Sequence, residues 1–435
     1  MDHRASQAPR RLVLKGRFVF PVAGEPIPNG SVTIEGRRIV AVGPASAAGT
    51  SAFHEVRDLG NVAILPGLIN AHVHLDFSDS TVPLGEPGRG LVPWLRRVMD
   101  YRRQSRGDGP RSVALGLAES IRCGVTTLGE IAQVDWPIEA AAAAPGNVTI
   151  FQELIAPTPR RVSATIELAK SHLRRAGTAA PPLQWEGDCE EGAEFGIGRP
   201  GLSPHAPYTV QPELLAAVIG LSATERIPVA MHLAESREEL ELLRSGAGPL
   251  RTLLEELGGW DAALVRPETR PMEYLRLLAG AHRALVIHGN YLDDEEIGFL
   301  GAHAERMAAV YCPRSHEWFD HDPYPLEKML AAGAVVALGT DGRGSSPDLS
   351  LWAEMRAVAR RHSSVPLDQV LEMGTILGAR ALGWEQDIGS LVPGKQADLA
   401  IVALADRNAA QPHELLFESG EPTIGCYYRG IEVCP

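Results

Sequence analysis

From Leu68 onward, short apolar segments alternate with longer helix-like segments, and this alternation restricts the fold more than any other feature of the chain. Strands that alternate with helices form parallel sheets, because each helix carries the chain back to the start of the next strand. Helix-like segments include residues 111–123, 211–226, 236–246 and 325–334. The apolar segments number eight, which predicts a closed (β/α)8 barrel of the TIM type; they are residues 67–75, 124–131, 147–155, 195–204, 227–235, 284–292, 307–315 and 335–342.

Both ends of the chain have β character without intervening helices. Short runs rich in Val, Ile and Phe occupy residues 11–20, 30–43 and 62–67, with Gly36 at a tight hairpin turn. No crossover helix fits between these runs, so we expect antiparallel strands. Similar runs return at residues 388–404 and 423–435. The α/β barrel, residues 66–384, is therefore expected to interrupt a small β-sandwich domain formed by residues 1–65 and 385–435.

Composition excludes several classes of partner. A net charge of −13 argues against a general affinity for nucleic acid or for anionic membranes. No apolar run reaches the roughly 18 residues needed to span a bilayer. The cysteines are scattered and form no C-x-x-C pair, which is typical of free thiols in a reducing compartment; they are Cys123, Cys189, Cys312, Cys426 and Cys434. We expect a soluble cytoplasmic protein.

Ionisable side chains follow the predicted barrel strands, at the ends that meet in one shared mouth. Residues i and i+2 of a strand point the same way, so His72 and His74 face one point. Each of these residues alone has a structural interpretation: a hydrogen-bonded core histidine, a turn aspartate or a solvated helix glutamate. Their joint placement at strand ends favours a single site, made of His72, His74, His205, His232, Glu235, His288 and Asp341.

Four of these residues suit one divalent metal ion: His72, His74, His232 and Asp341. Three imidazoles and a carboxylate, without a thiolate, favour Zn²⁺, with Fe²⁺ as the alternative. Such a metal lowers the pKa of a bound water towards neutrality, so the water becomes a nucleophile. The residues therefore predict a mononuclear hydrolytic site.

Seven segments resemble the metal-dependent amidohydrolase superfamily, in its deaminase and chlorohydrolase branch. They are PGLINAHVHL, SPHAPYTV, MHLAES, VIHGNYL, YCPRS, LGTDGRGSSPDLSLWAEMR and GSLVPGKQADLAIV, and the resemblance covers nearly the whole chain. It implies the same barrel and metal ligands, with Glu235 shuttling protons, His288 orienting the water and Asp341 taking its proton. It also implies that His205 contacts the substrate. No lysine lies in residues 195–205, so a second metal bridged by a carbamylated lysine is not expected.

The resemblance is closest to enzymes that deaminate adenine-bearing nucleosides: aminodeoxyfutalosine deaminases of menaquinone synthesis, and adenosylhomocysteine or methylthioadenosine deaminases. It implies that water replaces a ring amino group and ammonia leaves. The chain differs from many relatives at His316, where they carry Asn, and at Asp76, where they carry Glu. Arg343, Trp94 and His316 are expected to bind the substrate, and the other arginines that could meet a benzoate are Arg89, Arg96 and Arg314.

Three hypotheses stay open at this point, and the deaminase is the first of them. The same site could act as a chlorohydrolase or another amidohydrolase on a triazine, guanine or pyrimidine-type ring. A non-catalytic scaffold is the least favoured, because every expected ligand position is filled. The expected partner is a small heterocyclic substrate, and barrels of this type often pair as homodimers.

Overall fold

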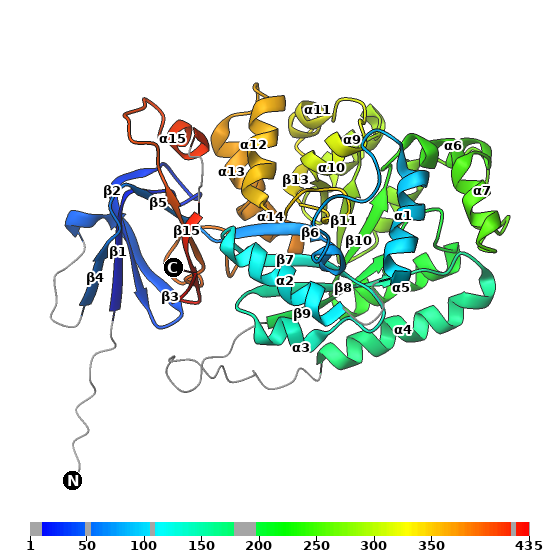
Figure 1. Cartoon of the computed structure of the whole chain (residues 1–435), viewed down its shortest axis with the longest axis horizontal. Helices are drawn as coiled ribbons and strands as arrows, with labels where there is room; N and C mark the ends of the chain where they lie inside the picture. Colours follow the sequence, from blue (N-terminus) through cyan, green and yellow to red (C-terminus); the bar gives the residue numbers. More distant parts are fainter. Residues whose placement is uncertain (1–10, 48–53, 105–108, 178–196, 419–422, 435) are drawn as a thin grey trace, which may run out of the picture.

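The computed structural model describes residues 11–47, 54–104, 109–177, 197–418 and 423–434. Figure 1 shows a small β domain beside a larger barrel of strands and helices. Cys189, residues 195–196 of the fourth expected strand, and the outermost residues of the expected β domain (1–10 and 435) lie outside these ranges.

The barrel contains the eight strands expected from the sequence, all parallel. They are β6 (Leu68–Val73), β7 (Val125–Ala132), β8 (Asn147–Leu154), β9 (Ile197–Pro204), β10 (Pro228–Leu233), β11 (Arg283–His288), β12 (Met307–Tyr311) and β13 (Val335–Leu338). Neighbours in sequence are neighbours in the sheet. A parallel bridge between Val73 and Asp341 joins the first strand to the segment after the last one and closes the ring.

Helices surround the barrel (Figure 1), and the four helices named from the sequence correspond to α2, α5, α6 and α11. The helices are α1 (Leu91–Gln104), α2 (Gly109–Arg122), α3 (Ile138–Ala143), α4 (Pro159–Gly177), α5 (Pro212–Glu225), α6 (Arg237–Ser245), α7 (Pro249–Glu256), α8 (Pro271–Leu278), α9 (Asp294–Ala302), α10 (Pro313–Trp318), α11 (Leu326–Ala331), α12 (Leu351–Arg361), α13 (Leu367–Met373), α14 (Ile376–Leu382) and α15 (Pro412–Glu418). Short 3₁₀ turns occupy Ala45–Ala47 and Leu75–Phe77.

The barrel strands read as continuous apolar runs because both of their faces are covered. Every residue of β6, β7 and β8 is buried. At the amino ends of the strands, α14 packs on β6 and the fully buried Trp384 donates from its indole Nε1 to Thr149 Oγ1 at 3.0 Å. Gly378 of α14 allows this approach, since a Cβ there would lie 3.0 Å from Ile69. The ionisable residues named above lie at the opposite end of the barrel, where the carboxyl ends of the strands meet.

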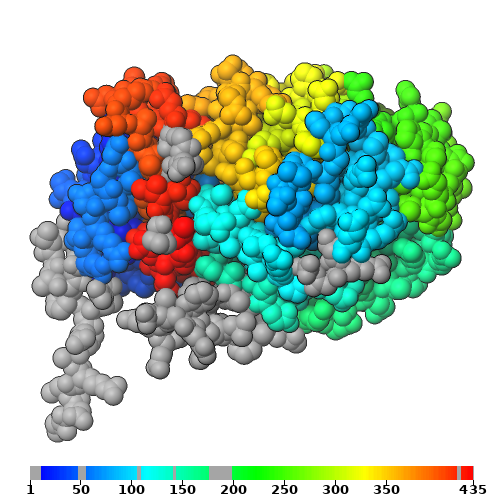
Figure 2. All heavy atoms as spheres, in the orientation of Figure 1, coloured from blue at the N-terminus to red at the C-terminus, as the bar shows by residue number. Residues whose placement is uncertain are grey.

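The β domain is one mixed sheet of eight strands drawn from both ends of the chain. Its strands are β1 (Arg11–Val19), β2 (Ile27–Glu35), β3 (Arg38–Pro44), β4 (His54–Asp58), β5 (Val62–Pro66), β14 (Leu399–Ala403), β15 (Thr423–Tyr428) and β16 (Ile431–Cys434). β5 pairs with β14, which joins the two chain ends, and Figure 2 shows the early and late segments packed side by side. The fold class is confirmed, while the domain boundaries at residues 65 and 385 stay a prediction.

The expectation that all these strands are antiparallel is wrong for two pairs. β1 pairs in parallel with β4 and with β5. The β2–β3 hairpin, which turns at Gly36 (φ 58°), carries the chain back to the start of β4. Two strands thus replace the crossover helix that a parallel connection usually needs.

Two further observations concern the described residues only. Cys123, Cys312, Cys426 and Cys434 are free thiols. Among the described helices, we find none whose length and apolar character would carry it across a bilayer.

Candidate metal centre and active site

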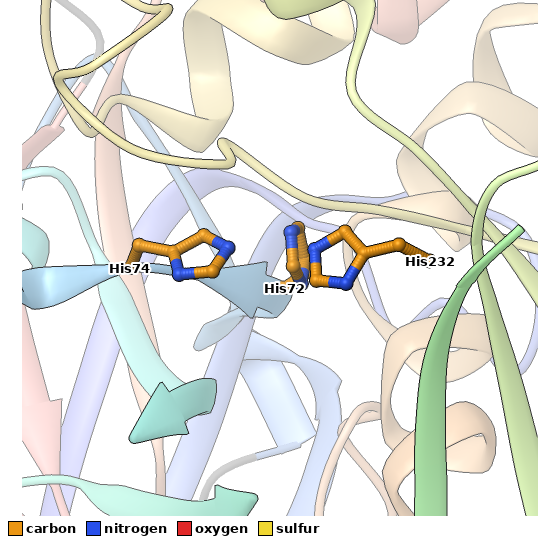
Figure 3. A group of neighbouring side chains, drawn as sticks. All are labelled: His72, His74 and His232. Atoms are coloured by element: carbon orange, nitrogen blue, oxygen red, sulfur yellow. The ribbon is translucent and has the colours of Figure 1, made fainter. Parts of the chain in front are cut away.

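Three histidine rings converge at the carboxyl ends of β6 and β10 (Figure 3). His72 belongs to β6, His74 follows it, and His232 belongs to β10. The ring centroids of His72 and His74 are 4.9 Å apart, and those of His72 and His232 are 5.1 Å apart. All three residues are buried. The predicted convergence of these rings from separate strands is therefore present.

Asp341 completes the group from the segment after β13. Its Oδ1 lies 3.5 Å from His72 Nε2 and 3.7 Å from His74 Nε2. Ligand atoms of a tetrahedral site with bonds of about 2.1 Å lie about 3.4 Å apart. Two groups of three residues each offer ligand atoms within 4.8 Å of one another: His72, His74 and His232, and His72, His288 and Asp341. The spacing fits a single ion.

The hydrogen bonds of these histidines leave nitrogens available to a metal. His232 Nδ1 lies 3.1 Å from the carbonyl oxygen of His205, which can only accept, so Nδ1 carries the hydrogen and Nε2 keeps its lone pair. Both ring nitrogens of His72 are buried without a hydrogen-bond partner among the described residues, and its Nε2 lies 3.5 Å from Asp341 Oδ1. A metal ion takes one nitrogen from each ring, so His72 Nε2 fits a ligand of a divalent cation.

The charge states also suit metal binding. Burial and the neighbouring His72 lower the pKa of His74 to about 3, and burial together with adjacent imidazoles lowers that of His232 well below its usual value. Both rings are therefore neutral, as a ligand must be. Burial alone would raise the pKa of Asp341, but His72, His288 and His74 lower it well below its usual range. Asp341 is thus a carboxylate.

Two serines hold the other oxygen of Asp341. Ser315 Oγ and Ser345 Oγ each donate to Asp341 Oδ2 at 2.9 Å, and all three side chains are buried. Ser315 belongs to α10, while Ser345 lies in the loop before α12. With Oδ2 occupied by these two hydroxyls, Oδ1 is directed at the histidines.

Glu235 and His288 lie beside the metal group. Glu235 Oε1 is 3.7 Å from His288 Nε2, and both residues are buried. Burial, reinforced by the Asp341 and Glu239 carboxylates, raises the pKa of Glu235 well above its ordinary value. Burial lowers the pKa of His288 to about 3. A neutral carboxylic acid beside a neutral imidazole can hold and transfer a proton.

The backbone around Glu235 is fixed by another buried carboxylate. Glu239 Oε1 accepts from Ala234 N and Oε2 from Glu235 N, both at 2.9 Å. Asn290 Nδ2 donates to the carbonyl oxygen of Glu235 at 2.8 Å. Glu235 is therefore held through both of its peptide groups.

Three strand ends in this site adopt left-handed backbone conformations that favour glycine. The φ angles are 53° for Ala234, 66° for His288 and 58° for Asp341. A non-glycine residue in this region costs about 1–3 kcal/mol. His288 and Asp341 are site residues, and Ala234 directly precedes Glu235. The strained backbone therefore lies where the chain turns to direct these side chains into the site.

The residues expected to contact substrate have different surroundings. His205, which follows β9, has its ring centroid 5.1 Å from that of His232. Trp94 of α1 donates from Nε1 to the carbonyl oxygen of Gly344 at 2.8 Å. Arg343 pairs with Glu119 of α2 at 2.8 Å, so protein groups already engage its guanidinium. His205 thus adjoins the metal group, whereas Trp94 and Arg343 brace the loop after β13.

In the described part of the chain, His316 of α10 is hydrogen-bonded to the protein through only one of its ring nitrogens. Its Nε2 donates to the carbonyl oxygen of Asp322 at 2.8 Å, while Nδ1 is buried with no partner among the described residues. A substrate contact for His316, Trp94 and Arg343 stays a prediction.

The other arginines and Asp76 are paired within the protein. Arg89 pairs with Glu86, Arg96 with Glu256, and Arg314 with Glu354. Asp76 Oδ2 accepts from Arg102 Nε at 3.0 Å. Arg102 was not among the expected cations, although it is near enough to His74 to contribute to the lowered pKa of that ring.

Sequence reasoning also missed Glu239, Ser315, Ser345 and Glu153, a buried glutamate at the end of β8. Glu153 had the strand-end signal that the predicted site residues share, and Glu239 had a signal of another kind. Ser236 and Glu239 form the S-x-x-E pattern of a helix start, and Ser236 Oγ does accept from Glu239 N at 3.2 Å. That pattern places Glu239 in the first turn of α6, facing back towards Glu235.

Comparison with known proteins gives concordant results. A model described as "Amidohydrolase family" matches residues 63–424. The chain is 31% identical over 446 residues to a 5-methylthioadenosine/S-adenosylhomocysteine deaminase of Moorella thermoacetica, covering 97% of this chain and 91% of the relative. Among solved structures, an aminofutalosine deaminase of Helicobacter pylori superposes with a TM-score of 0.82 at 20% identity, covering 97% of this chain and 100% of the other. A zinc-bound adenosine deaminase from Xanthomonas campestris gives 0.72 at 23% identity, covering 98% and 93%.

Proposed function

This chain belongs to the amidohydrolase family, and we propose that it is a metal-dependent hydrolytic deaminase of adenine-type nucleosides. The family and the enzyme class expected from the sequence are confirmed. The observation that carries the proposal is the placement of Glu235, a buried acid 3.7 Å from His288, beside the group of His72, His74, His232 and Asp341. This arrangement offers a proton donor next to a site for an activated water.

We assign the divalent metal to His72, His74, His232 and Asp341, and propose zinc, with iron as the alternative. Three imidazoles and one carboxylate suit either ion, and the bound zinc of the Xanthomonas campestris structure supports the first. When bound, the metal would lower the pKa of a water so that it can attack an electron-poor ring carbon.

The chain's own residues then handle the protons. Glu235, kept protonated by its raised pKa, donates to the ring nitrogen beside the attacked carbon and prevents negative charge from accumulating there. Asp341, an ionised carboxylate, accepts a proton from the attacking water, and His288 orients that water by a hydrogen bond. Asp341 returns its proton to the amino group. The C–N bond breaks and ammonia leaves. The remaining proton of the added hydroxyl passes to Glu235, which restores its acid form, and the ring carbon becomes a carbonyl.

The substrate proposal rests on the relatives. The Moorella thermoacetica relative is named for methylthioadenosine and adenosylhomocysteine, and the Helicobacter pylori structure is named for aminofutalosine. We propose an adenine-bearing nucleoside for this chain, with aminodeoxyfutalosine, and hence a role in menaquinone synthesis, as a narrower candidate. The net charge of −13 argues against a nucleic-acid partner, and the scattered cysteines support a cytoplasmic location. A homodimer is proposed by analogy with other barrels.

A substrate panel tests this function. Purified protein with a measured metal content is incubated with adenosine, methylthioadenosine, adenosylhomocysteine, aminodeoxyfutalosine and a chlorotriazine, and ammonia and chloride are quantified. We expect ammonia from at least one amino-purine nucleoside and about one equivalent of zinc or iron. Chloride release without ammonia would identify a chlorohydrolase instead. Full activity in metal-free protein would refute the metal assignment.

A further inference from the structure

A second polar pair lies next to the metal group and has no role in the proton steps above. Glu153 ends β8, and His205 follows β9, the next strand in the barrel. Glu153 Oε1 is 3.9 Å from His205 Nε2, too far for a hydrogen bond. Glu153 is only 5% exposed. The two side chains face each other without a direct bond.

Glu153 is held by its other oxygen. Gln133 Nε2 donates to Glu153 Oε2 at 2.6 Å, whereas Oε1 receives no hydrogen bond from the described residues. Burial alone would raise the pKa of Glu153, but His205 and Arg102 lower it below its usual value. Glu153 is therefore a carboxylate with one oxygen available as an acceptor.

His205 has one ring nitrogen directed at Glu153. Its Nδ1 lies 2.7 Å from Thr209 Oγ1, and the Thr209 hydroxyl donates to the carbonyl oxygen of Ala206. Since that hydroxyl has a single hydrogen, Nδ1 carries a ring hydrogen and donates to Thr209. Nε2 is the nitrogen that faces Glu153 Oε1 at 3.9 Å. Neither Glu153 Oε1 nor His205 Nε2 has a hydrogen-bond partner among the described residues.

The position of this pair relates it to the substrate. The His205 ring is 5.1 Å from that of His232, so the pair lies one side chain away from the metal group. Arg102 bonds Asp76 through its Nε, and burial raises the pKa of Glu130 well above its ordinary value, so Glu130 adds no negative charge. The Glu153 carboxylate itself would repel a substrate carboxylate, whereas a hydroxyl would supply the missing donor.

We propose that Glu153 and His205 form the binding site for the sugar hydroxyls of a ribonucleoside, with Glu153 as the specificity-determining residue. This inference rests on the proposed function, because it requires a nucleoside at the metal. A carboxylate can accept two donors at once, which suits the neighbouring 2′ and 3′ hydroxyls of ribose. The substrate group at this position is thus a donor, and any acidic group of the substrate must lie elsewhere.

The test combines one substitution with three nucleosides that differ in their sugar hydroxyls. Glu153→Gln keeps the size of the side chain but replaces one acceptor oxygen by an amide donor. We expect wild-type kcat/KM to be about 10- to 100-fold higher for adenosine than for 2′- or 3′-deoxyadenosine, since a lost hydrogen bond at a buried site has that effect. The substitution should lower kcat/KM for adenosine by a similar factor. For the deoxynucleoside that lacks the hydroxyl bonded by Glu153, kcat/KM should change less than about threefold.

Glu130→Gln is the matched control. Glu130 has a buried carboxyl group in the same region, but both of its oxygens already accept from the protein, from Leu75 N at 3.0 Å and Trp136 Nε1 at 2.8 Å. Its substitution should lower kcat/KM equally for all three nucleosides. An equal loss in Glu153→Gln would overturn the proposal, because a structural role does not discriminate between sugars. A gain in ribose selectivity would overturn it as well.

Binding separates this inference from the proposed function. If the wild type releases no ammonia from any nucleoside, the function fails, and calorimetric Kd values for adenosine and its deoxy analogues still decide the sugar site. Selective binding of adenosine that disappears in Glu153→Gln supports the site. Equal binding of all three nucleosides by the wild type refutes it.

Discussion

Substitution of Glu239 tests whether its two backbone hydrogen bonds hold Glu235 in position. Its carboxylate is fully buried and bonds the backbone N–H groups of Ala234 and Glu235 at 2.9 Å each. Glu239→Ala removes both acceptors, and Glu239→Gln leaves one acceptor oxygen and strands one N–H. Glu241, exposed on the same helix, provides the control substitution Glu241→Gln.

The magnitude follows from the stranded donors. A buried N–H that loses its acceptor costs about 1–3 kcal/mol, so Glu239→Ala should lower the free energy of unfolding by about 2–6 kcal/mol and Glu239→Gln by about half as much. A displacement of about 1 Å at a catalytic group lowers turnover about 100-fold, and Ala234 and Glu235 are the residues set free to move. The metal should be retained, because His232 is held separately by the carbonyl oxygen of His205.

Three measurements check this prediction: urea unfolding at fixed metal content, kcat for the best nucleoside, and metal stoichiometry. We expect Glu241→Gln to stay within about 0.5 kcal/mol of the wild type. If Glu239→Ala unfolds at the same urea concentration as the wild type and turns over substrate normally, the two hydrogen bonds do not position Glu235. Loss of the metal in Glu239→Ala would also contradict the reasoning, since it would tie Glu239 to the ligands.

Further predictions concern catalysis, metal affinity and pH. Glu235→Gln should retain the metal but lower kcat by about 10²- to 10⁴-fold, and undiminished turnover would exclude proton transfer by Glu235. Ser315→Ala combined with Ser345→Ala should weaken metal binding about 10- to 100-fold in chelator competition, because Asp341 Oδ2 loses both donors; unchanged affinity would show that they are dispensable. Burial raises the pKa of Asp398 from 3.8 to about 6, so its contribution to stability is present below pH 3.8 and declines by up to about 3 kcal/mol as pH rises through 6. Asp398→Asn should remove that decline from urea midpoints taken at pH 4 and pH 7, and an unaltered difference between the two midpoints would argue against it.

The barrel and the metal group could be predicted because each depends on a local pattern. A strand buried on both faces leaves a continuous apolar run, and a polar residue at its end, such as His232 or Asp341, stands out against that run. The topology of a parallel barrel then brings these ends together without further information. Neither step requires knowledge of which side chains touch.

The remainder depends on contacts between distant residues, which a single sequence does not reveal. Arg343 follows Asp341 closely and was therefore expected to meet the substrate, yet it pairs with Glu119, 224 positions earlier. Glu153 ends an apolar strand as the predicted site residues do, but its position opposite the ring of His205 depends on a contact between two strands. In the β domain, β1 and β5 can pair in parallel because the chain between them, which includes the β2–β3 hairpin, returns to the end of the sheet at which β1 begins. The sequence does not show this return.

The closure of the barrel at Val73 and Asp341 has a consequence for how the protein acquires its metal. Asp341 N donates to His72 O at 3.1 Å, and His74 N donates to Asp341 O at 2.8 Å, so backbone hydrogen bonds of the seam join the proposed ligands of the first strand to the one after the last. During synthesis His72 and His74 emerge long before Asp341, and the complete ligand set exists only after the eighth strand has docked. Tight metal capture therefore marks the end of folding, and a nascent chain stalled before residue 341 should bind the ion no better than two exposed histidines do.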